Sequence, residues 1–259
     1  MTVVYALGLA LLLSVAMAGA WWIGQTSGRS GRIDAIWTLS TGLAGIGAVA
    51  IGANHAPRAL LVVLFLAIWA VRLGGYLWRR AKHGEDARYA ALKEQWGERA
   101  PLQLFLFLQV QAVAAWPLAL SAYVAAGALE DIGLRDALAL LVFAAALIGE
   151  AVADAQMAAF KANPGNRGGI CETGLWSWSR HPNYFFEWFG WLGLPLLAIG
   201  PGYPLGWLAW LAPAEMYWLL VHVSGVPPLE VAMRRSRGKA FDRYAARVNA
   251  FWPMPPRSA

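Results

Sequence analysis

The sequence predicts an all-α, polytopic membrane protein: a bundle of seven transmembrane helices followed by an amphipathic carboxy-terminal tail helix. Hydrophobic residues make up 59% of the 259 residues, and charged residues make up only 14%. The chain contains seven apolar runs, and most of them have about the length that a bilayer crossing requires. The chain also contains 15 Trp residues, and Trp favours membrane interfaces. Together these observations indicate a protein embedded in a lipid bilayer.

The expected spans follow one another with little sequence between them. They are residues 3–23, 33–53, 59–78, 102–126, 137–159, 185–199 and 205–221. Most contain about 20 apolar residues, which is enough for a helix to cross the hydrocarbon core. The sixth is short, so its flanks must lie inside the membrane or against other helices. Because nearly the whole chain is used in spans, we expect a single domain over residues 1–259.

Basic residues lie in alternate gaps between the expected spans. Of the 21 Lys and Arg residues, 18 lie in the first, third and fifth gaps and in the tail. Because Lys and Arg concentrate on the cytoplasmic side, we expect the amino terminus outside and the carboxy terminus in the cytoplasm. The net charge of +6 follows from the same bias. It therefore indicates anionic lipid or an anionic cofactor as a partner, and not nucleic acid.

Three ionisable side chains share one face of the fifth expected span. Glu150 and Asp154 are one helical turn apart, and Lys161 follows two turns later. Ionisable groups in a span are costly unless they are paired or line a cavity, so these residues are candidates for a functional site. The alternative is that Asp154 and Lys161 only pair with each other at the interface.

The glycine-rich loop after this span is a candidate anion site. Gly165, Gly168 and Gly169 allow backbone N–H groups to converge on one anion. Arg167 and Arg180 can add bidentate contacts to a phosphate group. Loops of this kind are also common as simple turns, and the sequence contains no G-x-G-x-x-G motif that would indicate a dinucleotide fold.

A dense group of polar residues lies where the sixth expected span begins. Pro182 suits the first turn of a helix, so the free amides and the positive end of the helix dipole would point at a bound anion. His181 is equally well explained as an interfacial cap of this helix. The polar residues of the group are Arg180, His181, Asn183, Tyr184 and Glu187.

The segment SRHPNYFFEW, at residues 179–188, is where the chain is similar to a known family. With GLW before it, LE at 229–230 and the ending KAFDRYAARVNAFWP, it resembles the membrane reductases related to steroid 5-alpha-reductase. The resemblance is to their bacterial branch, which shares a carboxy-terminal domain of unknown function (DUF1295-like). It covers roughly residues 69–253 and includes the segment WAVRLGGYLWRRAKHGEDARY, with the reductase signature at about 137–256.

The resemblance implies a bundle in a bacterial inner membrane that holds NADPH between its cytoplasmic loops and the interior of spans five to seven. By position, it implies cofactor contacts at Asp154, Lys161, Asn183, Tyr184 and Glu187, with Arg72 and Tyr76 approaching the same cavity and Glu150 at a polar cofactor position. The charge argument adds Arg167, Arg180, His181, Glu230 and Arg234 as cofactor-binding candidates. No metal site is expected.

The reaction of the family delivers a hydride to a carbon–carbon double bond conjugated to a carbonyl, in a steroid-like or other lipophilic substrate. The protein must supply a hydrogen-bond donor to the carbonyl oxygen. Asn54 or His55 stands where the family has a carboxylate or amide, and Trp69 stands where it has a Tyr. An indole N–H is not a useful acid, so Tyr76 or His55 would supply the proton. His55 is also explained as an exposed loop residue, and steroid reduction itself does not follow from these residues.

Two other functional classes fit parts of the sequence. Isoprenylcysteine and phospholipid methyltransferases share an RHPxY segment and a similar tail, but they bind S-adenosylmethionine. They carry paired carboxylates before the last helix, whereas PPLEVAMRR offers only Glu230 followed by two Arg residues. A transporter would place polar groups through the whole bilayer, whereas here they crowd one side, with Glu215 in the seventh span as a main exception. The reductase is favoured because a positive tail suits a phosphate-bearing cofactor.

The tail after Pro228 predicts one more helix. Its apolar residues recur at helical spacing on the side opposite two Arg residues, which is typical of an amphipathic helix lying on the cytoplasmic face. Such a helix would close the cofactor pocket, or it would anchor the chain to anionic lipid. The apolar residues are Phe241, Tyr244, Ala245 and Val248, and the Arg residues are Arg243 and Arg247.

Overall fold

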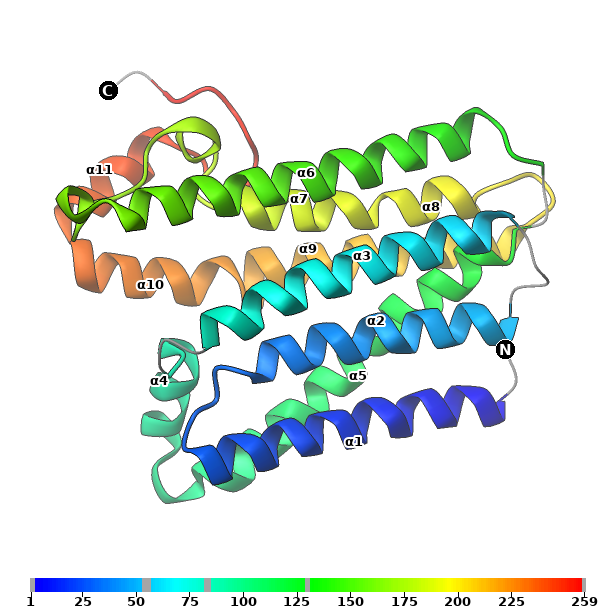
Figure 1. The fold of residues 1–259 in the computed structure, drawn as a ribbon, viewed down its shortest axis with the longest axis horizontal. Helices are drawn as coiled ribbons and strands as arrows, with labels where there is room; N and C mark the ends of the chain where they lie inside the picture. Colours follow the sequence, from blue (N-terminus) through cyan, green and yellow to red (C-terminus); the bar gives the residue numbers. More distant parts are fainter. Residues whose placement is uncertain (1–2, 53–56, 82–84, 129–130, 258–259) are drawn as a thin grey trace. The chain divides into compact units, whose positions relative to one another are not determined.

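The computed structural model describes residues 3–52, 57–81, 85–128 and 131–257. Apart from one isolated bridge between Ser179 and Asn249, the regular structure of these residues is helical, so the predicted all-α class is confirmed (Figure 1). The chain divides into two compact units. The first comprises Met1–Asp136 and Leu194–Ala212, and the second comprises Ala137–Gly193 and Pro213–Ala259. The expected single domain stays a prediction.

Long helices build the core of the first unit. They are α1 (Val3–Ser27), α2 (Ile33–Gly52), α3 (Pro57–Arg80) and α5 (Ala100–Ala126), with the shorter α4 (Ala87–Trp96) before α5. Helix α2 packs against α3 and α5, and α1 packs against α2 and α5. A Cβ atom on Gly42 would lie 2.5 Å from the Cβ of Ala70, so α2 and α3 approach closely at this point. Leu13, Leu104 and Leu108 are fully buried between α1 and α5.

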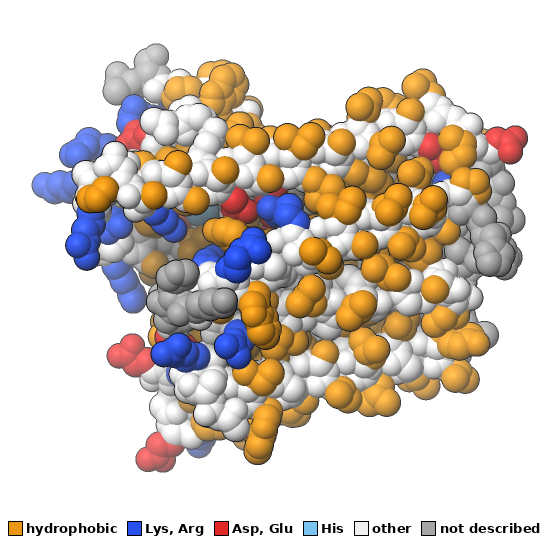
Figure 2. Space-filling model, viewed as in Figure 1, with side chains coloured by type: hydrophobic (Ala, Val, Ile, Leu, Met, Phe, Trp, Pro, Cys, Tyr) orange, Lys and Arg blue, Asp and Glu red, His pale blue; other side chains and the backbone are white. Residues whose placement is uncertain are grey.

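The outer faces of these helices are apolar. Val4, Leu7, Leu11 and Val15 lie along one side of α1 and are 61–76% exposed. Figure 2 shows hydrophobic side chains distributed along the helices. A large contiguous apolar surface is unfavourable in water and favourable in lipid. Helices α1, α2, α3, α5 and α6 (Leu134–Ala162) are long and apolar enough to cross a membrane, as expected of an integral membrane protein.

The sixth and seventh expected spans are broken into shorter helices. The sixth consists of α7 (Pro182–Trp191) and α8 (Gly193–Ala198), and the seventh consists of the 3-10 segment η5 (Pro204–Trp210), α9 (Leu211–Trp218) and the π-helical segment η6 (Leu219–Val223). Pro195 and Pro213 lie in the first turns of α8 and α9, where a missing N–H is tolerated, but neither can continue a preceding helix. Only five helices of the described chain qualify as spans by length and composition, so the count of seven is not confirmed.

Basic residues gather at one end of each unit. In the first unit, Arg29 and Arg32 lie between α1 and α2, and Arg32 stacks on Trp78 at the end of α3. In the second unit, Lys and Arg residues cluster around the end of α6, α10 (Val226–Arg237) and α11 (Lys239–Arg247), as Figure 2 shows. The clustering within each unit agrees with the charge pattern, while the orientation of the termini stays a prediction.

The opposite end of the first unit contains a buried ion pair. The side chains of Arg58 and Asp136 are each 2% exposed. Arg58 Nε donates to Asp136 Oδ1 at 2.5 Å, and Nη2 donates to Oδ2 at 3.0 Å. The guanidinium also donates to the carbonyls of Ala128 at 3.3 Å and Asp131 at 2.9 Å. Gly133 donates its N–H to Asp136 Oδ2 at 2.8 Å. Both buried charges therefore have several hydrogen-bond partners within the protein.

Replacing Arg58 by Met is expected to lower the free energy of unfolding by about 3–5 kcal/mol, because Asp136 is then buried without its countercharge. Thermal unfolding of the purified protein in a mild detergent measures the effect. The double variant Arg58→Met/Asp136→Leu should recover much of the loss, since it buries neither charge. A single variant as stable as the unmodified chain would show that the pair does not stabilise the fold.

Candidate functional site

The second unit places three buried carboxylates on two neighbouring helices. Glu150 and Asp154 of α6 are 3% and 9% exposed, and Glu187 of α7 is 9% exposed. Helices α6 and α7 lie side by side (Figure 1), and a Cβ atom on Gly149 would lie 2.4 Å from the ring of Phe186. Of the three residues predicted to share one face of α6, Lys161, near the end of the helix, is exposed, whereas Glu150 and Asp154 are buried. Ionisable groups at such depth are candidates for ligand contact.

The glycine-rich loop after α6 uses most of its amides within the loop. Gly165 donates its N–H to Asn163 Oδ1 at 2.9 Å, and Gly169 donates to the carbonyl of Asn166 at 2.8 Å. The predicted convergence of three glycine amides on one anion is therefore wrong for these two. The loop is a pair of local turns, and Gly168 adopts a φ of 82° that glycine tolerates best.

Helix α7 begins at Pro182, as expected, and its amino-terminal end is lined by rings. His181 occupies the capping position, but its side chain makes no capping hydrogen bond. Its ring instead stacks on the ring of Tyr184, with centroids 5.6 Å apart and an interplanar angle of 9°. The first amides of a helix have no carbonyl partner within the helix, and the positive end of the helix dipole lies here. This end of α7 therefore suits a negatively charged or polar ligand group.

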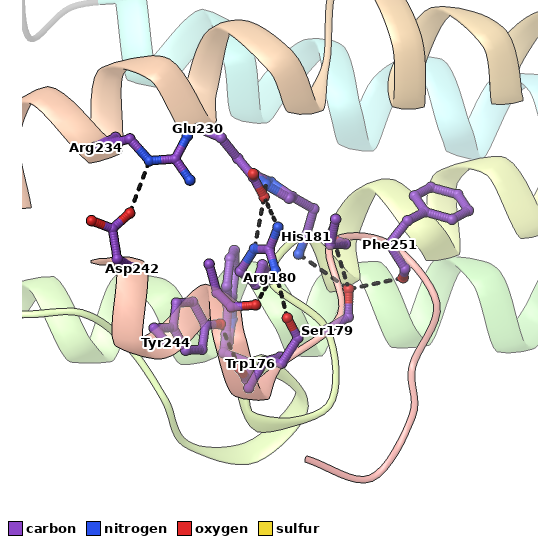
Figure 3. Close-up of polar contacts among 12 residues, drawn as sticks. Trp176, Ser179, Arg180, His181, Glu230, Arg234, Asp242, Tyr244 and Phe251 are labelled. Carbon is purple, nitrogen blue, oxygen red and sulfur yellow. Dashed lines mark hydrogen bonds and ion pairs between the residues drawn. The ribbon is translucent and has the colours of Figure 1, made fainter. Parts of the chain in front are cut away.

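Arg180 joins this end of α7 to the tail of the chain (Figure 3). Its Nε donates to Glu230 Oε1 at 2.7 Å, and its Nη2 lies 2.6 Å from the same oxygen. Its Nη1 donates to the carbonyls of Ala245, at 3.1 Å, and Val248. His181 Nε2 lies 3.4 Å from Glu230 Oε1. The guanidinium thus holds α10 and the end of α11 against the segment that precedes α7.

The carboxy-terminal segment lies against the loop that precedes α7. Ser179 Oγ donates to the carbonyl of Phe251 at 2.8 Å, and Tyr244 Oη donates to the carbonyl of Trp176 at 2.6 Å (Figure 3). Arg180 donates its backbone N–H to the carbonyl of Asn249 at 2.8 Å. The predicted amphipathic helix is confirmed as α11, whose apolar face is buried. It continues into an extended strap, residues 248–257, that follows the loop.

An aromatic cluster fastens the strap to α7 and α9. Phe251 packs against Phe185 and Tyr217, with ring centroids 5.7 Å and 5.5 Å apart. Trp252 packs edge-on against Trp188 at 5.2 Å. Aromatic pairs of this geometry contribute about 0.5–1.5 kcal/mol each beyond the burial of their surface. The end of the chain is therefore part of the structural frame around α7.

The predicted cations of the site fall into two groups. Arg234 is exposed and pairs with Asp242, with Nε and Oδ1 2.9 Å apart. Lys161 and Arg167 are exposed, and among the described residues no carboxylate pairs with either of them. The charges of Lys161 and Arg167, near the end of α6, are therefore available to an anionic ligand. The charges of Arg180 and Arg234 are already neutralised by Glu230 and Asp242.

The buried pair of His181 and Glu230 titrates abnormally. Burial lowers the pKa of His181 below its ordinary value of 6.5, although the neighbouring carboxylate of Glu230 partly opposes the shift. Burial alone would raise the pKa of Glu230, but the nearby ring of His181, the hydrogen bond from Arg180 and the guanidinium charge outweigh it and hold that pKa below 4.5. His181 is therefore neutral and Glu230 ionised near neutral pH.

The structure brings together part of the predicted site. Around the amino-terminal end of α7 it places the cluster of Arg180, His181, Tyr184 and Glu230, and on α6 and α7 it buries Glu150, Asp154 and Glu187. Asn183 lies in the first turn of α7 and is partly buried. Trp69, Arg72 and Tyr76 lie on α3 and belong to the first unit. Asn54 and His55 lie outside the described residues.

Sequence reasoning missed the residues that frame this site. Ser179 is fully buried and bonds the strap, while Trp176 donates its indole N–H to the carbonyl of Ala153 at 3.0 Å. Tyr244 was recognised only as part of an apolar face, whereas its hydroxyl bonds the loop before α7. The aromatic pair Phe251 and Trp252, directly before a Pro, was the sequence signal for a packed terminal segment.

Comparison with known proteins gives a family but no activity. A family model described as "Protein of unknown function (DUF1295)" matches residues 20–248. An uncharacterized protein of Schizosaccharomyces pombe is 26% identical over an alignment that covers 94% of this chain and 78% of that protein. No solved structure matches the chain significantly.

Acidification is expected to destabilise the protein through His181. Because burial holds the folded-state pKa below 6.5, the stability contributed by the neutral ring is present above that pH and is lost as pH falls toward the folded-state value. Thermal unfolding in detergent at about pH 7.5 and about pH 5.5 measures the loss, and His181→Gln should lose less stability over this window.

His222→Gln is the matched control, because His222 is exposed on η6. This control should keep the pH dependence of the unmodified protein. Equal pH dependence in the unmodified protein and in His181→Gln would exclude a buried neutral ring at position 181.

Proposed function

The chain belongs to the DUF1295 family, and we propose that it is a membrane-embedded, NADPH-dependent reductase. The reaction would deliver a hydride to a carbon–carbon double bond conjugated to a carbonyl in a steroid-like or other lipophilic substrate. The observation that carries the proposal is the set of buried carboxylates on α6 and α7, beside the RHPNY segment through which the chain resembles membrane reductases. The chain would act in a bacterial inner membrane, with its carboxy terminus in the cytoplasm.

The donor and acceptor groups of the second unit fit a phosphorylated dinucleotide. Asp154, Glu187 and Glu150 are buried acceptors suited to ribose hydroxyls and to the carboxamide N–H₂ group. Lys161 and Arg167 are exposed cations suited to phosphate groups, and the positive end of α7 adds to their field. The nicotinamide, when bound, supplies the hydride. The residues of this chain bind it, orient it and exclude water.

The cluster of Arg180, Glu230 and His181 would hold the entrance of this site. The ion pair fixes α10 against the start of α7, and the neutral ring of His181 is stacked on Tyr184, where it offers a flat surface. A neutral imidazole is a much weaker acid than an imidazolium, so it does not readily donate a proton at neutral pH. We therefore do not assign the proton transfer to His181; among the catalytic candidates taken from the sequence, Tyr76 carries a hydroxyl that can donate a proton.

A methyltransferase is the second candidate, because a group of buried carboxylates also suits the positive sulfonium of S-adenosylmethionine. The state of Glu230 argues against it. This residue is the only carboxylate of the PPLEVAMRR segment, and its Oε1 is already engaged by the guanidinium of Arg180. Its charge is therefore already neutralised within the protein, and the two exposed cations Lys161 and Arg167 favour an anionic cofactor.

Binding of NADPH and S-adenosylmethionine should be measured side by side by calorimetry on the purified protein in a mild detergent. We expect NADPH to bind and S-adenosylmethionine not to bind. Asp154→Asn and Glu187→Gln should each weaken NADPH binding about tenfold or more, because each removes a charged acceptor.

Asp242→Asn is the matched control, since Asp242 is an exposed carboxylate of the same unit that pairs with Arg234. This variant should bind NADPH as the unmodified protein does. Binding of S-adenosylmethionine alone would establish the second candidate, and NADPH affinity unchanged in both site variants would remove the cofactor from α6 and α7.

A further inference from the structure

The turn between α1 and α2 forms a second basic site, in the first unit. An open recess of about 260 Å³ lies there, lined by Ser27, Arg29, Gly31, Arg32 and Ala81. Two Arg residues therefore border the recess, and the other residues that line it are small. We call this feature the basic recess.

Several cations at this end of the unit have carboxylate partners, whereas within the described part of the chain the two Arg residues of the basic recess do not. Arg88 pairs with Asp34 and Asp86, and Lys93 pairs with Glu85 at 3.0 Å. In the ranges that the structure describes, no carboxylate pairs with Arg29 or Arg32. The nearby carboxylates of Asp34, Glu85 and Asp86 already pair with other cations.

Both oxygens of the Glu85 carboxylate have partners. Its Oε2 accepts the backbone N–H of Ser30 at 2.7 Å, and its Oε1 accepts a hydrogen bond from Lys93. The carboxylate thus shapes the turn that carries Arg29 and Arg32 without neutralising either side chain. The recess is a positively charged concavity whose countercharge has to come from outside the described chain.

The basic recess lies at the level where a bilayer presents its headgroups. Arg32 stacks on Trp78, with Cζ 4.9 Å from the ring centroid, and this ring is 38% exposed near the end of α3. Trp22, near the end of α1, is 62% exposed. Exposed Trp residues at the ends of apolar helices favour the interface between hydrocarbon and water. At this depth the nearest external anions are lipid phosphates.

We propose that the basic recess binds the phosphate group of an anionic lipid. Each guanidinium carries two parallel N–H groups, a fork that can donate two hydrogen bonds to the oxygens of one phosphate. A Lys ammonium group has the charge but not this paired geometry. Gly31, which has no side chain, lines the recess together with the two Arg residues. The inference is independent of the reductase assignment, because it uses only residues of the α1–α2 turn and the end of α3.

Native mass spectrometry of the full chain in detergent micelles tests the proposal. The probes are dioleoyl phosphatidylglycerol, dioleoyl phosphatidylcholine and inorganic phosphate. We expect phosphatidylglycerol to be retained most strongly. Each of Arg29→Gln and Arg32→Gln should weaken its binding about fivefold, and the double variant about 25-fold. The double Lys variant should recover only part of the affinity, since it keeps the charge without the forks.

Arg99→Gln is the charge-matched control, because Arg99 is exposed just before α5 and does not line the recess. It should bind phosphatidylglycerol as the unmodified protein does. Retention of inorganic phosphate that the double variant loses would assign the phosphate site to a soluble anion as well as to lipid. Equal weakening by Arg99→Gln, or no weakening in the double variant, would overturn the proposal.

Discussion

The ion pair between Arg180 and Glu230 is the interaction on which the second unit depends. The guanidinium of Arg180, two residues before α7, contacts the carboxylate of Glu230 on α10 and the carbonyls of Ala245 and Val248 at the end of α11. The two side chains are 11% and 16% exposed, so removing one partner would leave the other charge poorly solvated, at a cost of about 3–5 kcal/mol. Segments some 50 to 70 residues apart in the chain are therefore held together at one point.

This arrangement changes the interpretation of the basic residues near the site. Arg180 is held by protein groups, so in the proposed function it would act on a ligand only indirectly, by placing His181 and the start of α7. Lys161 and Arg167 keep their charges available. In the proposed function, the buried carboxylates of α6 and α7 would supply the polar contacts to the cofactor, while the aromatic strap packs against α7. In the proposed function, the cofactor would lie beside a framework in which Arg180 and Glu230 already neutralise each other.

Much of the fold was predictable because hydrophobic length is a local property of the sequence. The five long apolar helices and the buried face of α11 follow from composition and spacing alone. The breaks at α8 and α9 were harder to foresee, since Pro195 and Pro213 interrupt runs that remain apolar. The partners of Arg180 could not be predicted, because an arginine beside a glycine-rich loop fits a phosphate as well as a distant carboxylate. Only the tertiary placement of α10 decides between them.

Hydrogen–deuterium exchange of the strap is the most direct test of this central claim. Within it, Met254 and Arg257 donate their N–H groups to the carbonyls of Trp178 and Arg247 at 3.0 Å and 2.9 Å. In Glu230→Gln, which weakens the hold on Arg180, peptides covering residues 248–257 should exchange faster than in the unmodified protein, while peptides of α1 should not change. Unchanged exchange of residues 248–257 in this variant would contradict the account.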